Sequence, residues 1–264
     1  MTPFISRMVI TIVLVPIVLG AVWLGHWWMF ALVAIATALA LHEYWLMARP
    51  LSPLAPAGYI GAAVALVGAE MSGVSWMLAG VLSTFALAFV LKAISEARAA
   101  ATAAISATVM GTLWIGGGLG FMILLREIPH HGRLALVTLL VAVWAGDTFA
   151  YLGGRLLGRH KMAPSTSPGK TWEGFVFGTA ATIFVAFVAL YKQNFLTIRE
   201  SIILGVVLAL AGPIGDLFES LLKRDMAVKD TGRLLGGHGG MLDRLDALFV
   251  TSALVYLYTL WKAS

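Results

Sequence analysis

The sequence predicts an all-α polytopic membrane protein with about nine transmembrane helices and a cytoplasmic N-terminus. Three observations predict this class. Hydrophobic residues fill 60% of the 264 positions and charged residues only 12%, with a mean hydropathy of +0.91. These values lie outside the range of soluble domains. Apolar runs of membrane-span length recur along the chain, and Lys and Arg concentrate in alternate connections between them.

Nine apolar runs are long enough to be membrane helices. They lie at residues 8–24, 28–47, 56–70, 75–91, 105–125, 134–154, 174–191, 201–220 and 244–261. The first is interpreted as a span and not as a signal peptide, because more apolar runs follow at once and no small-residue cleavage site is evident. The third is short and rich in Gly and Ala, so it either spans the membrane or re-enters it.

The positive charges predict the orientation. With the N-terminus in the cytoplasm, the inside segments hold 13 of the 18 Lys and Arg and the outside segments hold 5. Because cytoplasmic loops carry the excess of positive charge, the C-terminus is predicted to lie outside. Both long polar connections, 155–173 and 221–243, then face the cytoplasm, where nucleotides are found.

Composition also limits the partners and the domain organisation. The chain has no cysteine, which excludes disulfides and thiolate metal sites. Its net charge of +5 is modest and fits cytoplasmic loops and phosphate chemistry, so no nucleic acid partner is expected. Polar residues concentrate late in the chain. We therefore predict an N-terminal transmembrane region at 1–104 and a C-terminal catalytic region at 105–264.

The first half of the chain offers little chemistry. His42 and Glu43 sit late in the second run and are interpreted as a polar pair that reaches the interface, in preference to a catalytic pair. The Ala-rich segment 97–107 is predicted to be an interfacial connection. GTLWIGGGLG at 111–120 lies inside a span and lacks the Lys-Ser/Thr of a phosphate loop, so its glycines predict close helix packing.

Asp147 lies within the sixth predicted span, and Tyr151 and Arg155 follow on the same helical face. An acid at this depth marks a functional site or pairs with a neighbour such as Arg155, and the sequence leaves both readings open.

SPGKT at 167–171 is predicted to be a Gly-containing turn before a helix. Its Ser167, Lys170 and Thr171 suit a phosphate at a helix N-terminus. The full Walker spacing is absent because Pro164 stands where its first Gly would be.

The stretch 216–246 is the main candidate site. It holds six of the thirteen acids and five of the eighteen Lys and Arg, and apolar runs flank it on both sides. Such charge between membrane helices is costly unless it faces water, a ligand or an ion.

Two stripes of polar residues face each other across this stretch. Asp216, Ser220 and Lys223 share one helical face, and Asp243 and Asp246 share another. Carboxylates without His or Cys partners favour a hard cation, which predicts Mg²⁺.

The loop between the stripes is basic and rich in glycine. Lys223 and Arg224 at its start, with Lys229 and Arg233 after them, would offset phosphate charge. His238 lies within GGHGG at 236–240. It either donates a hydrogen bond to a phosphate or acts as an acid or base, or it is simply a histidine in a turn. Arg244 is either a site residue or an internal partner of the acids. The residues alone thus predict Mg²⁺-dependent phosphoryl or nucleotidyl transfer at the cytoplasmic face.

One motif carries a resemblance to a known family. It runs over 27 residues: Ser220-Leu-Leu-Lys223-Arg224, Lys229-Asp230-Thr-Gly232 and His238-Gly-Gly-Met-Leu-Asp243-Arg244-Leu-Asp246. This pattern resembles the signature of the phosphatidate cytidylyltransferases, or CDP-diacylglycerol synthases. Asp147, Ala150-Tyr151, Gly154-Arg155, Ser167-Pro168, Lys170-Thr171 and Glu173-Gly174 are also similar to the family. Gly169 replaces a usual Lys, and Gly236 a common Pro, which puts one triphosphate contact in doubt.

The resemblance implies that CTP and phosphatidic acid give CDP-diacylglycerol and pyrophosphate at the bacterial inner membrane. It implies a homodimer and a paired-metal centre in which Mg²⁺ is joined by a second cation. Asp216 and Asp243 would be the metal ligands. The catalytic set would be Lys223, Arg224, Asp230, His238 and Asp246. The substrate-binding set would be Asp147, Ser167, Lys170, Thr171, Ser220, Lys229 and Arg244.

Three other functions are alternatives to this one. A CTP-dependent lipid kinase of the dolichol or phytol kinase type would transfer the γ-phosphoryl group and release CDP. An ion transporter would pair acids across inverted halves, but nine of the thirteen acids lie at or after Asp147. An inactive scaffold is disfavoured because the acids are intact.

Overall fold

The computed structural model describes residues 3–95, 100–190, 196–232 and 239–263, and nine long helices run through them. These helices and the shorter elements are α1 (Pro3–Leu24), α2 (His26–Met47), η1 (Arg49–Leu51), α3 (Ala55–Ser72), α4 (Val74–Ile94), α5 (Ala101–Gly111) continued by η2 (Thr112–Gly117) and α6 (Gly118–Arg126), α7 (Gly132–Leu157), β1 (Lys161–Ala163), β2 (Ser167–Thr171), α8 (Trp172–Leu190), α9 (Ile198–Asp225) and α10 (Leu242–Ala263). Each predicted run coincides with one long helix, so the predicted order of helices is confirmed.

Within the described residues, six of the helices are long and apolar enough to cross a membrane. These are α2, α4, the continuous helix α5–η2–α6, α7, α8 and α9. The protein is therefore a polytopic membrane protein. That α1, α3 and α10 also span the membrane stays a prediction.

The third predicted run is an uninterrupted helix of 18 residues, α3, which packs along α4. Glycines bring these two backbones together. A Cβ atom on Gly80 of α4 would lie 2.3 Å from the backbone nitrogen of Ala65 on α3. Small residues at a helix interface permit such close packing inside a membrane.

The prediction of an interfacial connection at 97–107 is wrong from Ala101 onward, where α5 begins. Alanine has the highest helix propensity, so this segment continues the helix. The glycines of 111–120 do pack closely, as predicted. A Cβ on Gly118 would lie 2.8 Å from the Cα of Phe249 on α10.

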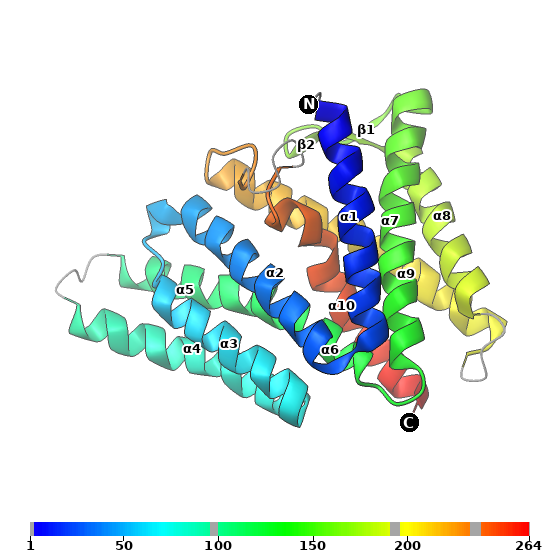
Figure 1. Ribbon diagram of the computed structural model, residues 1–264. Helices are drawn as coiled ribbons and strands as arrows, with labels where there is room; N and C mark the ends of the chain where they lie inside the picture. The colour runs from blue at the N-terminus through cyan, green and yellow to red at the C-terminus, as the bar shows by residue number, and fades with distance from the viewer. Residues whose placement is uncertain (1–2, 96–99, 191–195, 233–238, 264) are drawn as a thin grey trace.

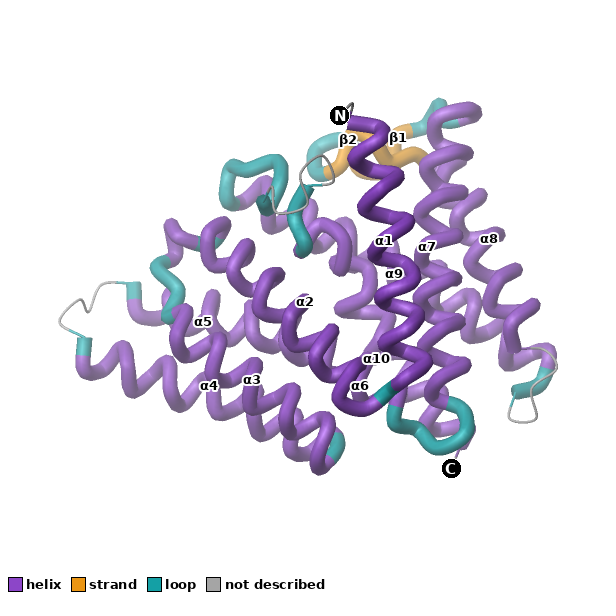
Figure 2. The backbone as a smooth tube through the Cα atoms, in the orientation of Figure 1, coloured by secondary structure: helices purple, strands orange, loops and turns teal. Residues whose placement is uncertain are grey.

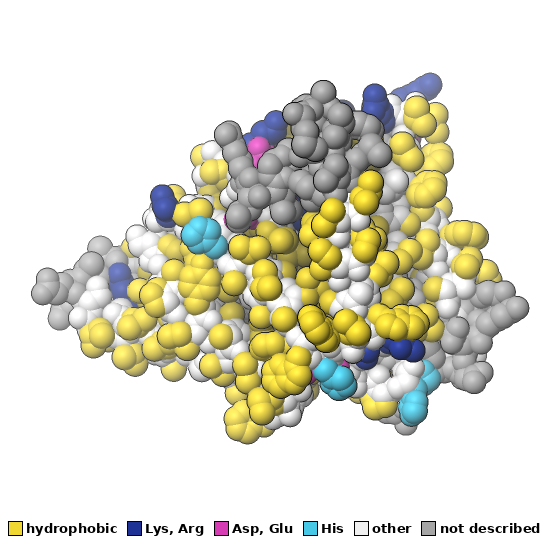
Figure 3. Space-filling view, in the orientation of Figure 1, with side chains coloured by type: hydrophobic (Ala, Val, Ile, Leu, Met, Phe, Trp, Pro, Cys, Tyr) yellow, Lys and Arg dark blue, Asp and Glu magenta, His cyan; other side chains and the backbone are white. Residues whose placement is uncertain are grey.

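The helices form two groups joined by α6 and α10. In Figure 1, α2–α5 lie on one side and α7–α9 on the other. Helix α10 packs against α9, α6, α7 and α2, and so connects both groups. Figure 2 shows the β1–β2 hairpin and the described loop after α9 at the end where the N-terminus lies, opposite the C-terminus. In Figure 3 hydrophobic side chains are spread over the described part of the visible face, as expected for a surface in contact with lipid.

The one departure from an all-α fold among the described residues is the β1–β2 hairpin. Its strands are antiparallel, with Lys161 opposite Thr171 and Ala163 opposite Ser167. The prediction of a turn at 167–171 is therefore wrong, because these residues form strand β2. Strands of three and five residues are too short to show a clear alternation in the sequence.

Candidate active site

A cavity of about 580 Å³ opens between the hairpin and helices α7, α8, α9 and α10. It is lined by Asp147, Ala150, Tyr151, Gly154, Arg155, Met162, Ser167, Gly169, Lys170, Thr171, Gly174, Phe175, Gly212, Pro213, Asp216, Lys223, Asp243, Arg244 and Asp246. Nine of the fourteen predicted site residues are in this lining: Asp147, Ser167, Lys170, Thr171, Asp216, Lys223, Asp243, Arg244 and Asp246. Residues from 147 to 246 thus converge on a single cavity.

Four carboxylates reach the cavity from three helices: Asp147 from α7, Asp216 from α9, and Asp243 and Asp246 from α10. Close packing of α9 on α10 brings Asp216 near Asp243 and Asp246. A Cβ on Gly215 would lie 2.5 Å from the carbonyl oxygen of Asp246. A larger residue at Gly215 would separate the helices and their acids.

The Asp216 carboxylate is paired with a lysine from the hairpin. Its Oδ2 lies 2.7 Å from Lys170 Nζ, which also donates to the carbonyl of Pro213 at 3.4 Å. The Ser220 hydroxyl donates to Asp216 Oδ1 at 3.4 Å, as their shared helical face predicts. The hairpin and α9 are therefore joined at the cavity by a charge pair.

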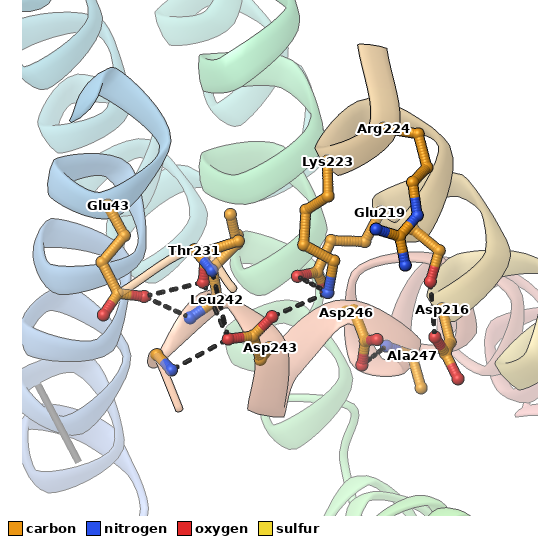
Figure 4. A network of polar contacts seen from close by, with 12 residues as sticks. Glu43, Asp216, Glu219, Lys223, Arg224, Thr231, Leu242, Asp243, Asp246 and Ala247 are labelled. Atoms are coloured by element: carbon orange, nitrogen blue, oxygen red, sulfur yellow. Dashed lines mark hydrogen bonds and ion pairs between the residues drawn. The ribbon is translucent and has the colours of Figure 1, made fainter. Parts of the chain in front are cut away.

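Lys223 lies between two carboxylates (Figure 4). Its Nζ is 2.8 Å from Asp243 Oδ1 and 3.0 Å from Glu219 Oε1. The Glu219 side chain is fully buried, with 0% exposure. Glu219 is not among the site residues that the sequence predicts. Its position four residues before Lys223 was the available signal, since such pairs meet on one helical face.

Asp243 is held from the loop that precedes α10. Its Oδ2 accepts hydrogen bonds from the backbone N–H of Gly240 at 2.9 Å and from the Thr231 hydroxyl at 3.0 Å. Asp246 Oδ1 accepts from the N–H of Ala247 at 2.7 Å. Both carboxylates keep a fixed orientation at the start of α10.

The hairpin is attached to α8 at the helix N-terminus. The Thr171 hydroxyl accepts a hydrogen bond from Gly174 N at 3.2 Å, as an N-cap residue does. Glu173 accepts from the backbone N–H of Arg159 at 3.1 Å and pairs with His160 Nδ1 at 2.6 Å. Lys170 is thereby presented to the cavity from a short, firmly anchored strand.

The three α7 residues that the sequence places on one helical face all lie at the cavity. Asp147, Tyr151 and Arg155 all line it. Arg155 Nη1 donates to the Tyr151 hydroxyl at 3.1 Å.

Among the described predicted residues, Ser220, Arg224, Lys229 and Asp230 are not part of the lining. Ser220 acts on it through Asp216. Arg224 is exposed and donates from Nε to the carbonyl of Thr166 at 3.2 Å, which ties the end of α9 to the hairpin. Lys229 and Asp230 are exposed in the loop after α9. His238 and Arg233 lie outside the described residues.

The interpretation of His42 and Glu43 as an interfacial polar pair is wrong for Glu43. Its side chain is buried, with only 1% of its surface exposed, and it accepts a hydrogen bond from Leu242 N. The exposed His42 faces away and contacts the Tyr59 hydroxyl at 3.4 Å. Sequence spacing gave no signal for Glu43, because 199 positions separate it from Leu242.

The donor set fits a hard cation shared with a substrate. Within the described residues, no three His, Asp or Glu side chains are arranged to hold a metal ion by themselves. Mg²⁺ usually takes one or two protein carboxylates and completes its shell with water and substrate phosphate. Asp216 and Asp243, each balanced by a lysine in one cavity, suit that kind of site.

Several known proteins are similar in sequence to about half of this chain. A phosphatidate cytidylyltransferase of Haemophilus influenzae is 41% identical over 125 residues, which cover 46% of this chain and 43% of that protein. Proteins of the same name from Staphylococcus saprophyticus and Staphylococcus aureus are 43% and 44% identical over 131 and 132 residues. These matches cover 49% of this chain and 50% of each relative. The matched segment therefore spans about half the length of these relatives.

A family model covers much more of the chain. The model described as the cytidylyltransferase family matches residues 5–261. This range includes every described residue of the cavity lining. The chain therefore belongs to the cytidylyltransferase family.

Proposed function

We propose that this protein is a phosphatidate cytidylyltransferase, which converts CTP and phosphatidic acid into CDP-diacylglycerol and pyrophosphate. The observation that carries the proposal is the pairing of Asp216 with Lys170 and of Asp243 with Lys223 in one cavity. The cavity thus places carboxylates that can bind a cation next to lysines that can bind phosphates. A volume of about 580 Å³ falls in the range of small-molecule sites.

The reaction is an in-line displacement. A phosphate oxygen of phosphatidate attacks the α-phosphorus of CTP, the bond from that phosphorus to the bridging oxygen breaks, and pyrophosphate leaves. The attacking oxygen is already anionic, so the site needs no strong general base. The main task of the protein is to bring two anions together and to balance their charge.

Charged groups around the cavity have separate roles in this proposal. Lys170 binds the triphosphate, and Lys223 and Arg244 balance charge near the reacting phosphates. Mg²⁺ held by Asp216 and Asp243, with Asp246 beside them, would neutralise charge on the phosphate oxygens. Ser167, Thr171 and Asp147 complete the binding surface. Arg224 at the end of α9, together with Lys229, Asp230 and His238, which follow α9 in the sequence, is proposed to act on the substrates.

The assay that tests the function supplies purified protein with CTP, Mg²⁺ and either phosphatidate or a polyprenol. We expect a CDP-lipid from phosphatidate, one pyrophosphate for each lipid, and no product from the polyprenol. Formation of a polyprenyl phosphate with release of CDP would instead assign the protein to the lipid kinases.

We further propose that the protein is a homodimer in the bacterial inner membrane, with its N-terminus and the cavity on the cytoplasmic side. Because the chain has no cysteine, single cysteines report the orientation directly. Ser165→Cys lies at the exposed hairpin turn, and His130→Cys is exposed between α6 and α7. In intact cells an impermeant thiol reagent should label residue 130 and not residue 165. The reverse pattern would contradict the proposed orientation, because the cavity would then face away from the cytoplasm, where CTP is found.

Lys170→Ala should raise the KM for CTP about tenfold or more, because a charge-assisted phosphate contact is lost. The KM for phosphatidate should change much less. Lys161→Ala is the matched control, since Lys161 is exposed on the partner strand β1 and should leave both constants unchanged. Gly169→Lys restores the residue that is usual in the resembled family and should keep or improve CTP affinity. Equal KM values for CTP in Lys170→Ala and the wild type would show that Lys170 does not bind the triphosphate, and would assign that contact to the loop after α9.

A further inference from the structure

Glu43 of α2 lies outside the cavity lining, yet its carboxylate contacts the loop that carries the family signature. Oε2 accepts a hydrogen bond from the backbone N–H of Leu242 at 2.8 Å, and the Thr231 hydroxyl, which donates to Asp243, lies 3.4 Å from the same oxygen (Figure 4). A carboxylate that is 1% exposed is costly to bury unless such donors hold it. Its position therefore calls for a purpose beyond helix packing.

Gly232 and Gly240, which lie on either side of residues 233–238 in the sequence, both bring their backbone close to this carboxylate. A Cβ on Gly232 would lie 2.3 Å from Glu43 Oε1, and a Cβ on Gly240 would lie 2.3 Å from Oε2. Only glycine allows the backbone to come this close. The nearby Glu43 carboxylate is thus a direct steric reason why positions 232 and 240 of the signature are glycine.

The groups that contact Glu43 also fix Asp243. The Thr231 hydroxyl lies 3.0 Å from Asp243 Oδ2, and the N–H of Gly240 donates to the same oxygen at 2.9 Å. Leu242, held by Glu43, is the residue directly before Asp243. A shift of the loop away from Glu43 would therefore turn the Asp243 carboxylate away from the cavity.

The end of α2 is itself rigid. The Tyr44 hydroxyl donates to the carbonyl of Ala107 at 3.0 Å, and its ring packs edge-on against Trp114. Trp114 in turn packs against Phe218 of α9 and Phe249 of α10. Glu43 is therefore presented to the loop from a well-packed aromatic frame shared with both site helices.

We propose that Glu43 is a positioning residue, which holds Thr231, Gly240 and Leu242 so that Asp243 faces the cavity. The expected effect of Glu43 on turnover rests on the proposed function. If the proposal holds, the N-terminal region, which contains α2, helps to position the site residues. The negative charge is not needed at the cavity itself, so a neutral acceptor of the same shape should replace it.

The test compares Glu43→Ala and Glu43→Gln with His42→Ala as the matched control on the adjacent, outward-facing position. Hydrogen–deuterium exchange of a peptide covering 239–245 reports the Leu242 amide without any substrate. Glu43→Ala should raise its exchange rate about tenfold or more, because a buried hydrogen bond to a charged acceptor is lost. Exchange in α8, far from Glu43, should not change. Glu43→Gln and His42→Ala should exchange like the wild type.

Kinetics separate positioning from general damage. Glu43→Ala should lower kcat about tenfold or more, with the KM for CTP within about twofold, because Lys170 and the hairpin do not contact Glu43. Glu43→Gln should restore turnover, since its carbonyl oxygen accepts from the Leu242 N–H. Thr231→Val keeps the side-chain shape and should show the same two changes, faster exchange at 239–245 and lower kcat, but smaller. It replaces Glu43→Ala in the test if that variant does not fold.

Three outcomes would overturn the proposal. They are unchanged exchange at 239–245 in folded Glu43→Ala, faster exchange throughout the protein, and a Glu43→Gln variant as inactive as Glu43→Ala. A different result would separate the two proposals. If Glu43→Ala raises exchange at 239–245 as expected but the wild-type protein makes no CDP-lipid, the proposed function is refuted and the positioning role of Glu43 stands.

Discussion

Replacing Asp216 or Asp243 by Asn is expected to reduce turnover by about a thousandfold or more while the protein remains folded. Asn keeps the side-chain shape and removes the charge that attracts a hard cation. Loss of that cation removes charge neutralisation in the transition state, which is worth several kcal/mol. Excess Mg²⁺ should rescue each variant only partly.

The matched control is Asp225→Asn at the end of α9, where the side chain is exposed. It should retain wild-type turnover. The double variant Asp216→Asn/Asp243→Asn should be hardly worse than either single variant, because residues that act as one unit are not additive. Normal turnover in either single variant, with its fold confirmed, would show that the aspartate is a structural ion-pair partner and not a metal ligand.

The second large effect is expected at Lys223 and Glu219. Lys223→Met should destabilise the protein by about 3–5 kcal/mol, since it leaves the buried Glu219 carboxylate without its cation. It should also abolish turnover, because Asp243 loses its lysine at the cavity. Thermal unfolding in detergent measures the first effect and CDP-lipid formation the second.

The pair can be separated by a second substitution. Lys223→Met/Glu219→Gln removes the buried Glu219 charge but still leaves Asp243 without its lysine, so it should regain part of the lost stability and remain inactive. Recovery of turnover together with stability would show that Lys223 is needed only to neutralise Glu219. Lys262→Met, which breaks the ion pair with Glu200 at the other end of α9, should leave turnover near normal.

The helices were predictable because each follows from local composition. Runs of apolar residues bounded by charges reveal membrane helices without any knowledge of their neighbours. The acids of the site were predictable for the opposite reason, since Asp147, Asp216 and Asp243 are exceptional within or beside such runs. The division at residues 104 and 105 remains a prediction.

What the sequence did not predict depends on contacts between distant segments. Strand β2 exists because it pairs with β1, and its five residues alone resemble a turn. Glu43 and Leu242 are 199 positions apart, so no periodic pattern connects them. Glu219 lay within the predicted stretch, but its burial under Lys223 follows from the packing of α9 on α10.

The most direct test of the proposed reaction follows the position of the label in CTP. Purified protein receives phosphatidate and Mg²⁺ with CTP labelled at either the α- or the γ-phosphate. We expect the α-label in the lipid fraction and the γ-label in pyrophosphate, in equal molar amounts, with neither product from Asp216→Asn. Recovery of the γ-label in lipid, with CDP in the aqueous phase, would contradict cytidylyl transfer.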